Sequence, residues 1–202
     1  MHMTELHQAS GPVPPVTANA RTDACIIAAS RRDPQAFEAL FERYWPELHA
    51  FCCARAGAAG EDVAAETFRV AFDKRRGYDL GYPDARPWLY GIATRLVQHH
   101  FRRDRRHAAA IERSGRLLAH PEVAGASSDL ERWLLGPEVA AAVDGLSGEE
   151  RDALLLWAWA DLSYSEIAQA LAVPVGTVRS RLNRARQRVR NHLEERNQDD
   201  RQ

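Results

Sequence analysis

The stretch 163–195 constrains the fold of this 202-residue chain most, because it joins the signals of a short and a long helix through a tight turn. Ser163 and Glu166 have the spacing of a capping box, in which each side chain satisfies the backbone N–H of the other residue. The turn Ala172-Val173-Pro174 ends the short helix, and the longer one follows. Apolar residues at steps of three and four are expected to pack the two helices together: Ile167, Ala168, Leu171, Val178, Leu182, Ala185 and Val189. The pattern predicts a helix-turn-helix.

The face of the longer helix opposite this apolar stripe carries donors and planar groups suited to base edges and phosphates. We call it the reading face, and it comprises Thr177, Arg179, Ser180, Asn183, Arg184 and Gln187. Residues 175–190 hold six Arg and no acidic residue. The alternative is a solvated basic face on an ordinary helical hairpin, but such a face usually interleaves opposite charges. The pattern therefore favours DNA binding.

Charge is segregated along a chain whose net charge is only −1. Residues 23–106 carry 14 basic and 12 acidic residues, residues 107–174 carry 4 and 11, and residues 175–202 carry 8 and 4. A basic C-terminal element thus follows an acidic middle segment. This asymmetry indicates local interaction surfaces that the average charge conceals.

The sequence predicts a cytoplasmic protein without membrane insertion. It has no run of about 18 apolar residues, and Gly and Pro residues within 11–15 fall where a signal peptide needs an apolar core. Three cysteines, Cys25, Cys52 and Cys53, form no disulfide framework and suit a reducing compartment. His49 shares a helix face with Cys52 and Cys53, which leaves a metal site as the alternative to buried thiols. The apolar character of that face favours buried thiols.

The strict alternation typical of strands is absent from the sequence, so the predicted fold class is all-α, with two small helical domains joined by a flexible acidic linker. Apolar spacing and capping residues predict further helices over 23–31, 34–55, 61–75, 85–106, 138–146 and 148–160. The predicted organisation is a disordered leader 1–22, a first domain 23–106, a linker 107–137, a helix-turn-helix domain 138–195 and a tail 196–202.

The helix-turn-helix resembles the −35-reading domain of bacterial RNA polymerase sigma factors of the extracytoplasmic-function (ECF) group of the sigma-70 family. The resemblance lies in Val173-Pro-Val-Gly-Thr-Val-Arg-Ser-Arg-Leu-Asn-Arg-Ala-Arg186. Three N-terminal segments are similar to region 2 of that family, in the same order: Ala36–Tyr44, Glu61–Phe72 and Pro87–Arg95. The chain departs from the family at Ala65, where Gln is common, and at Ala172, where Gly is common in the turn.

The resemblance implies a transcription initiation subunit, not an enzyme, with no catalytic residue, metal ligand or cofactor. The implied partners are core RNA polymerase, promoter DNA and, as for many members of the group, an anti-sigma factor. Docking on the clamp helices of the largest polymerase subunit is implied for Asp62, Glu66, Phe68 and Phe72. Contact with the −35 element is implied for the six residues of the reading face. Recognition and melting of the −10 element are implied for Tyr78, Tyr82, Arg86, Trp88, Arg95, Arg102 and Arg103.

The residues are compatible with two other functions, each less well than with a transcription initiation subunit. A one-component helix-turn-helix transcriptional regulator would bind DNA as a dimer without joining polymerase. It would need a sensor or dimerisation domain, whereas residues 23–106 resemble a docking and melting domain. An enzyme is disfavoured further, because His99, His100 and His107 lack the spacing of a nucleophile, metal or phosphate site.

Overall fold

The computed structural model describes residues 22–113 and 136–199, without the side chains of 108–113 and 197–199. These residues form helices and no strand, which confirms the all-α prediction. The helices are α1 (Asp23–Ser30), η1 (Pro34–Phe37), α2 (Glu38–Ala56), η2 (Gly57–Ala59), α3 (Gly60–Lys74), η3 (Arg75–Gly77), α4 (Arg86–Arg113), α6 (Pro137–Asp144), α7 (Gly148–Ala158), α8 (Tyr164–Leu171) and α9 (Val175–Asp199). The predicted leader, apart from its last residue, and most of the predicted linker lie outside the described residues.

Side-chain caps determine where several helices begin. Thr22 caps α1 and Asp33 caps η1 through their side-chain oxygens. The capping boxes at the starts of α7 and α8 are both complete, as predicted. One boundary was predicted wrongly. α4 continues to Arg113, beyond the expected end at Arg106, because the intervening residues are helix formers without Gly or Pro.

The first domain is built from α1 to α4, and α3 packs along both α2 and α4. Gly60 allows the close approach of α3 to α2, since a methyl group there would overlap the backbone of Cys53. Fully buried apolar side chains fill the space between these helices: Leu40, Leu48, Phe51, Ala64, Ala71, Leu89 and Val97. The core fixes the orientation of α4, the helix predicted to melt DNA.

The helix-turn-helix domain is built from α6 to α9. α9 is its longest helix and packs on α6, α7 and α8. The predicted apolar stripe is confirmed, because Ile167, Val178, Leu182 and Ala185 are completely buried. Leu156 of α7 and Leu162, which precedes α8, complete this core.

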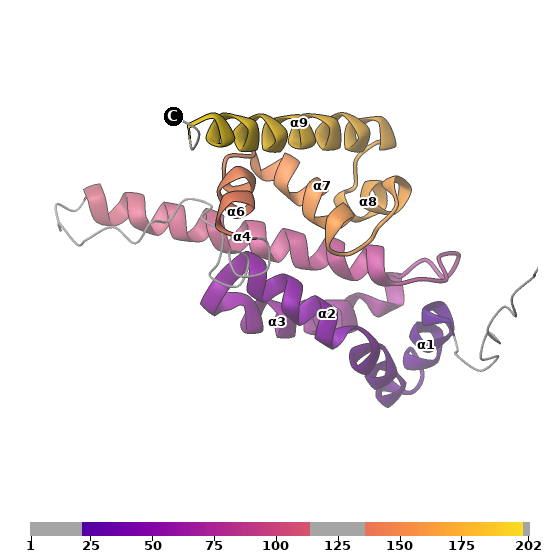
Figure 1. The fold of residues 1–202 in the computed structure, drawn as a ribbon. Helices are drawn as coiled ribbons and strands as arrows, with labels where there is room; N and C mark the ends of the chain where they lie inside the picture. Colours follow the sequence, from indigo (N-terminus) through magenta and orange to yellow (C-terminus); the bar gives the residue numbers. More distant parts are fainter. Residues whose placement is uncertain (1–21, 114–135, 200–202) are drawn as a thin grey trace, which may run out of the picture.

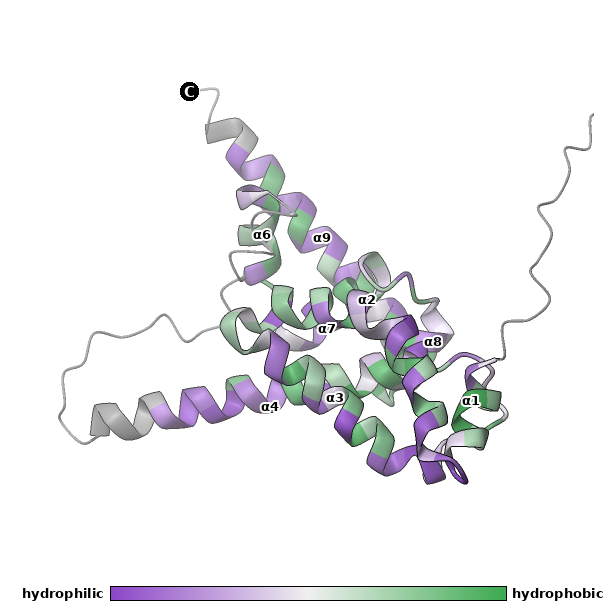
Figure 2. Cartoon of the chain, turned by 90° about the horizontal axis from the view of Figure 1, so that it is seen from below, coloured by the Kyte–Doolittle hydropathy of each residue, from purple (hydrophilic) through white to green (hydrophobic). Residues whose placement is uncertain are grey.

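The two domains lie against each other, with α4 between α2 and α3 on one side and the helix-turn-helix on the other (Figure 1). One continuous cluster of buried apolar residues runs through both domains. Figure 2 shows apolar residues gathered where the helices meet, whereas the stretch of α4 that precedes its grey end is mostly hydrophilic. Among residues 22–113 and 136–199, no helix combines the length and the apolar character that crossing a membrane requires.

Candidate nucleic-acid interface

The turn between α8 and α9 has the geometry that its sequence predicts. Ala172 ends α8 in the left-handed conformation, with φ 54° and ψ 47°, and its N–H donates to the carbonyl of Gln169. The carbonyl of Pro174 then accepts from the N–H of Thr177 at 2.9 Å and begins α9. The turn directs the first residues of α9 away from the domain core.

The reading face lies on the solvent side of α9. Thr177 is half-buried, and the other five residues, Arg179, Ser180, Asn183, Arg184 and Gln187, are exposed. The Ser180 hydroxyl donates to the carbonyl of Thr177 at 2.9 Å, which leaves its lone pairs free for a further bond. The face therefore presents hydrogen-bonding groups without rearrangement of the helix.

Two adjacent acids of α7 contact the arginines of α9, a relation that the sequence pattern did not predict. Glu149 pairs with Arg181 at 2.6 Å. The buried carboxylate of Glu150 lies 3.5 Å from Nε of Arg184 and 2.7 Å from Nη1 of Arg188. The sequence contained one indication of these ion pairs. Arginines one turn apart on a helix without acidic residues repel each other, which favours a carboxylate from another helix beside them. Glu150 thus joins Arg184 of the reading face to Arg188, and neither Glu150 nor Arg188 was predicted to belong to that face.

The two tyrosines of the loop before α4, Tyr78 and Tyr82, differ in their exposure to solvent. Tyr78 is only 6% exposed, and its hydroxyl donates to the carbonyls of Tyr82 at 2.8 Å and Asp84 at 3.1 Å. Burial raises the pKa of this hydroxyl, and nearby carboxylates add to the effect. Trp88 lies half-buried with its ring 4.9 Å from that of Tyr78. The Tyr78 ring is therefore packed within its loop, whereas Tyr82 is 47% exposed, and stacking of either ring on a base stays a prediction.

A buried carboxylate holds the start of α4. Asp23 accepts from the N–H of Ala85 at 2.7 Å and from the Tyr44 hydroxyl at 2.6 Å, and it is paired with Arg43. Arg86, predicted at the −10 site, is half-buried and bonded to Asp84 at 2.9 Å. The start of α4 is therefore held on α1 by a hydrogen bond to Asp23, and Arg86 is held by Asp84 of the preceding loop.

The remaining predicted arginines of α4 have different surroundings. Arg95 donates to the carbonyl of Ala170 in α8 at 3.3 Å. Arg102 lines a cavity of about 480 Å³ between the two domains, together with Arg105 and Asp152. Arg103 is exposed. Arg95 and Arg102 thus lie at the domain boundary, and all three arginines are exposed.

The predicted docking residues of α3 divide into surface and core. Asp62 is exposed, and Glu66 pairs with Arg69 at 2.5 Å, a contact that lowers the pKa of the glutamate. Phe68 is 5% exposed and packs against Phe41 and Trp45, and its role as a docking contact stays a prediction. The spacing of an aromatic on an amphipathic helix did not reveal which side it faces.

Phe72, the fourth predicted docking residue, is half-buried. Its ring contacts Phe37 edge-on at 5.4 Å, and the Arg75 guanidinium lies 3.7 Å above it. Of the four predicted docking residues, Asp62 and Glu66 are thus the polar groups on the α3 surface, and Arg69 lies beside Glu66.

Of the three residues His49, Cys52 and Cys53, only His49 and Cys53 contact each other through their polar side-chain atoms. Cys53 Sγ lies 3.4 Å from Nε2 of His49, while Cys52 is completely buried, and burial raises its pKa to about 12. Within the described parts of the chain, no three His, Cys, Asp or Glu side chains are grouped to hold a metal. The buried position of Cys52 agrees with the predicted apolar helix face.

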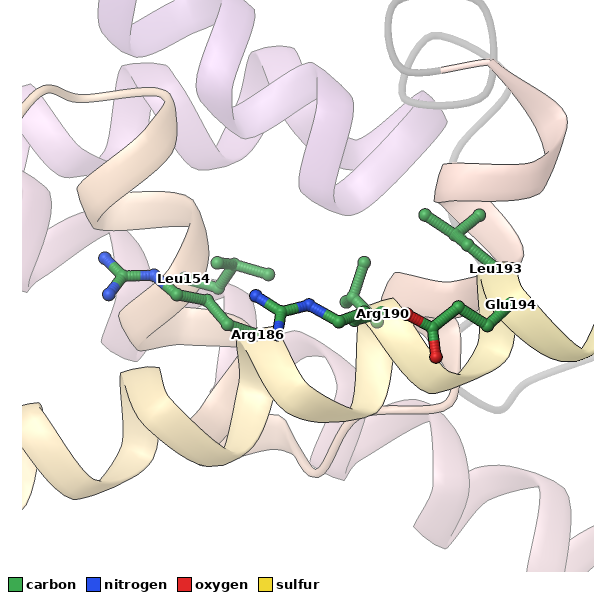
Figure 3. Close-up of a pocket in the computed structure, with 6 residues that line it drawn as sticks. Leu154, Arg186, Arg190, Leu193 and Glu194 are labelled. Atoms are coloured by element: carbon green, nitrogen blue, oxygen red, sulfur yellow. The ribbon is translucent and has the colours of Figure 1, made fainter.

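A separate pocket of about 320 Å³ lies between α7 and α9 (Figure 3). Leu154, Val189 and Leu193 form its apolar walls, and Arg186 and Arg190 extend along it. No member of the reading face lines this pocket. The reading face and the pocket are distinct surfaces of α9.

Two family models match the chain. The model described as "Sigma-70 region 2" matches residues 40–107, and "Sigma-70, region 4" matches residues 138–189. "ECF RNA polymerase sigma factor SigE" of Mycolicibacterium smegmatis is 37% identical over 138 residues, 66% of this chain and 51% of that protein. "ECF RNA polymerase sigma factor SigC" of Mycobacterium tuberculosis is 31% identical over 179 residues, 85% of this chain and 92% of that protein.

A solved structure has a similar arrangement. It is the sigma factor RpoE in complex with the anti-sigma factor NepR, from Bartonella quintana. The TM-score is 0.57 with 25% identity, covering 78% of this chain and 96% of that one. The region 2 model, over residues 40–107, overlaps the first domain, and the region 4 model, over residues 138–189, overlaps the helix-turn-helix domain.

Proposed function

The chain belongs to the ECF group of sigma-70 family sigma factors, and from this premise we propose that it binds core RNA polymerase and directs promoter-specific initiation. In this role it reads the −35 and −10 elements and opens the −10 region. The observation that carries the proposal is the reading face of α9. Its exposed donors lie opposite a fully buried apolar stripe, at the second helix of a helix-turn-helix.

We assign the −35 element to the reading face. Arg179 and Arg184 can donate to guanine edges or phosphates, and Asn183 can pair with an adenine edge. The Glu150 carboxylate lies behind the reading face and is paired with Nε of Arg184. The terminal nitrogens of that guanidinium can then donate to DNA. Side-chain contacts of this kind supply sequence discrimination, whereas the neighbouring arginines supply affinity.

The −10 element is assigned to the loop before α4 and to the first turns of that helix. Tyr82 offers an exposed ring for stacking on an unpaired base, and Trp88 lies next to the loop. Arg95, Arg102 and Arg103 contact backbone phosphates, which carry no sequence information. Melting then follows because a displaced base finds a stacking partner while its phosphates are neutralised.

Docking on the clamp helices of the largest polymerase subunit is assigned to the exposed face of α3. Asp62 and Glu66 supply its carboxylates, and Arg69 supplies a cation beside them. Charged groups on such a surface direct association more than they add affinity. Phe68 contributes by holding α3 on α2.

Further partners follow from the same assignment. The related RpoE structure contains an anti-sigma factor, and we infer that this chain also binds one. It acts in the cytoplasm, where core polymerase and chromosomal DNA are found. It needs no cofactor and catalyses no reaction of its own, because RNA synthesis is performed by the polymerase.

The test uses purified full-length chain, core polymerase and promoter fragments selected from the source genome. Arg184→Ala should weaken binding to the selected promoter by roughly 1–3 kcal/mol while core binding is kept. Glu66→Arg should weaken core binding instead. The control Arg196→Ala removes an exposed arginine of α9 outside the reading face and should change neither. DNA binding as a dimer that polymerase does not influence would favour the one-component regulator and overturn the proposal.

A further inference from the structure

The cavity between the two domains has one wall that belongs to a single side of α4. The residues of this wall are spaced three and four positions apart along the helix: Gln98, Phe101, Arg102 and Arg105. Leu146 and Gly148 of the helix-turn-helix domain lie on the opposite wall. The volume of about 480 Å³ falls within the range of about 300–1,000 Å³ that is typical of small-molecule sites. Of the residues on the α4 wall, the proposed function uses only Arg102.

The acidic residues of the cavity already have cationic partners. Each of the three is paired with an arginine: Asp144 with Arg151 at 3.1 Å, Asp152 with Arg55 at 2.7 Å and Glu149 with Arg181 at 2.6 Å. Arg102 and Arg105 also line the cavity, and within residues 22–107 and 136–196 no carboxylate is paired with either of them. The cavity therefore holds two positive charges that the described carboxylates do not neutralise.

These two guanidiniums have the spacing and the charge to hold one phosphate group. Arg102 and Arg105 lie one turn apart, where like charges repel each other, and an anion between them removes this repulsion. A guanidinium donates two parallel hydrogen bonds to phosphate oxygens, which an ammonium group does not. A phosphate monoester carries about −1.5 to −2 charges near pH 7, which matches the charge of the two arginines. Gly148 adds backbone donors at the start of α7.

The rest of the cavity suits a planar heterocycle. Phe101 is half-buried and presents an aromatic ring beside the arginines, and Leu146 adds an apolar side chain from the other domain. The amide nitrogen of Gln98 donates to Asp152 at 2.5 Å, so the amide oxygen of Gln98 can accept from a ligand. Aromatic rings stack on bases, and an amide oxygen accepts from the exocyclic amine of a base. The cavity thus offers partners for both ends of a nucleotide.

We propose that this cavity binds a nucleotide, whose phosphate is held by Arg102 and Arg105 and whose base lies against Phe101. A free nucleotide fits better than a DNA strand, because the buried pair of Arg55 and Asp152, 6% and 2% exposed, closes the deep end of the cavity. A strand would need a groove that continues past each nucleotide. Binding requires neither polymerase nor promoter, so the proposal stands apart from the proposed function.

Four variants test the site from both of its walls. Arg105→Gln removes one of the two cations at an exposed position, and Arg106→Gln is the matched control, since Arg106 is exposed and does not line the cavity. Phe101→Leu removes the ring but keeps an apolar side chain. Gly148→Leu fills the cavity from the other domain, where a Cβ meets no atom within 4 Å. Arg102 is left unchanged because it is also assigned to DNA.

Isothermal titration calorimetry of the full-length chain measures binding of AMP, GMP, inorganic phosphate and adenosine. At least one of the two nucleotides should bind with a Kd below about 1 mM, and more tightly than phosphate or adenosine. Arg105→Gln and Gly148→Leu should weaken its binding about tenfold or more, whereas Arg106→Gln should leave the Kd unchanged. Phe101→Leu should weaken binding of the nucleotide at least about threefold and leave binding of phosphate unaltered. Circular dichroism verifies that each variant keeps its helices.

Three outcomes would overturn the proposal. In the first, neither AMP nor GMP binds to the wild-type chain. In the second, Arg106→Gln weakens binding as much as Arg105→Gln, so that the nucleotide is attracted by the basic surface of α4 and not by the cavity. In the third, inorganic phosphate binds as tightly as the nucleotide and Phe101→Leu has no effect, which would leave a phosphate site without selection for a base. The comparison of Arg105→Gln with Arg106→Gln remains decisive if a core variant loses its helices, because both arginines are exposed.

Discussion

The carboxylate of Glu150 lies 2.7 Å from the guanidinium of Arg188, although the glutamate side chain is only 6% exposed. The same carboxylate accepts from the N–H of Ser147 and lies 3.5 Å from Nε of Arg184. An acid is thus buried directly behind the surface assigned to DNA. It repels phosphates in general while it holds two arginines in one orientation.

Replacing Glu150 should therefore separate affinity from selectivity. Glu150→Gln retains a capping group for α7 but removes the negative charge. Binding to scrambled duplex should tighten by about two- to threefold, since one acid fewer opposes the phosphates. The ratio of specific to scrambled affinity should fall, because Arg184 and Arg188 are held less firmly. Fluorescence anisotropy with both duplexes measures this ratio.

Glu166→Gln is the control for that prediction, since it alters the equivalent capping box of α8, and no ion pair joins Glu166 to α9 among the residues described. Its affinity ratio should equal that of wild type. An unchanged ratio in Glu150→Gln would show that Glu150 only caps its helix.

The two tyrosines of the loop should give opposite results. Tyr82→Ala removes an exposed ring and should lower open-complex formation while the unfolding temperature is kept. Tyr78→Phe removes a hydroxyl with two backbone acceptors and should lower the free energy of unfolding by about 1–2 kcal/mol. A template with a pre-melted −10 bubble should restore much of the activity of Tyr82→Ala. Loss of opening in Tyr78→Phe alone would contradict this division.

Ala172 holds a conformation that favours glycine. At φ 54° the Cβ of Ala172 crowds its own backbone, and this conformation is strained. Ala172→Gly should therefore raise the free energy of unfolding by up to about 1 kcal/mol. Ala65→Gly, at an exposed position inside α3, should lower it by about 1 kcal/mol. Urea unfolding of both variants tests the pair. Equal destabilisation by both would mean that the turn is not strained.

The cysteines should differ in reactivity. Burial raises the pKa of the Cys52 thiol to about 12, so at pH 8 it stays protonated in the folded chain, whereas the unfolded thiol ionises near its ordinary value. Cys25 is exposed and should be alkylated first. Mass spectrometry after brief treatment with iodoacetamide, with and without urea, measures both sites. Rapid native modification of Cys52 would contradict its burial.

Local chemistry explains why much of the fold was predictable. The capping boxes at Ser147 and Ser163 act within four residues, and the stripe through Val178 and Leu182 follows the helical period. Ala172 takes the left-handed conformation at a turn position where glycine is common in the family. These features need no information from distant parts of the chain.

Other features depend on contacts between distant residues. Arg55 and Asp152 are 97 positions apart and lie in different domains, so no local pattern indicated their pairing. Tyr78 and Phe68 are aromatic residues of the kind that is common in binding surfaces. Their rings are nevertheless buried, that of Tyr78 by its loop and that of Phe68 by α2. Hydrophobic burial and hydrogen bonding decided their positions, and neither can be predicted from residue type alone.

Permanganate footprinting of the −10 region tests the central claim most directly. It uses the full-length chain, core polymerase and a promoter duplex selected from the source genome. Reactive thymines are expected across the −10 element only when both proteins are present, with reactivity reduced in Tyr82→Ala. Thymines that stay unreactive with both proteins, although the chain binds the same duplex alone, would contradict it.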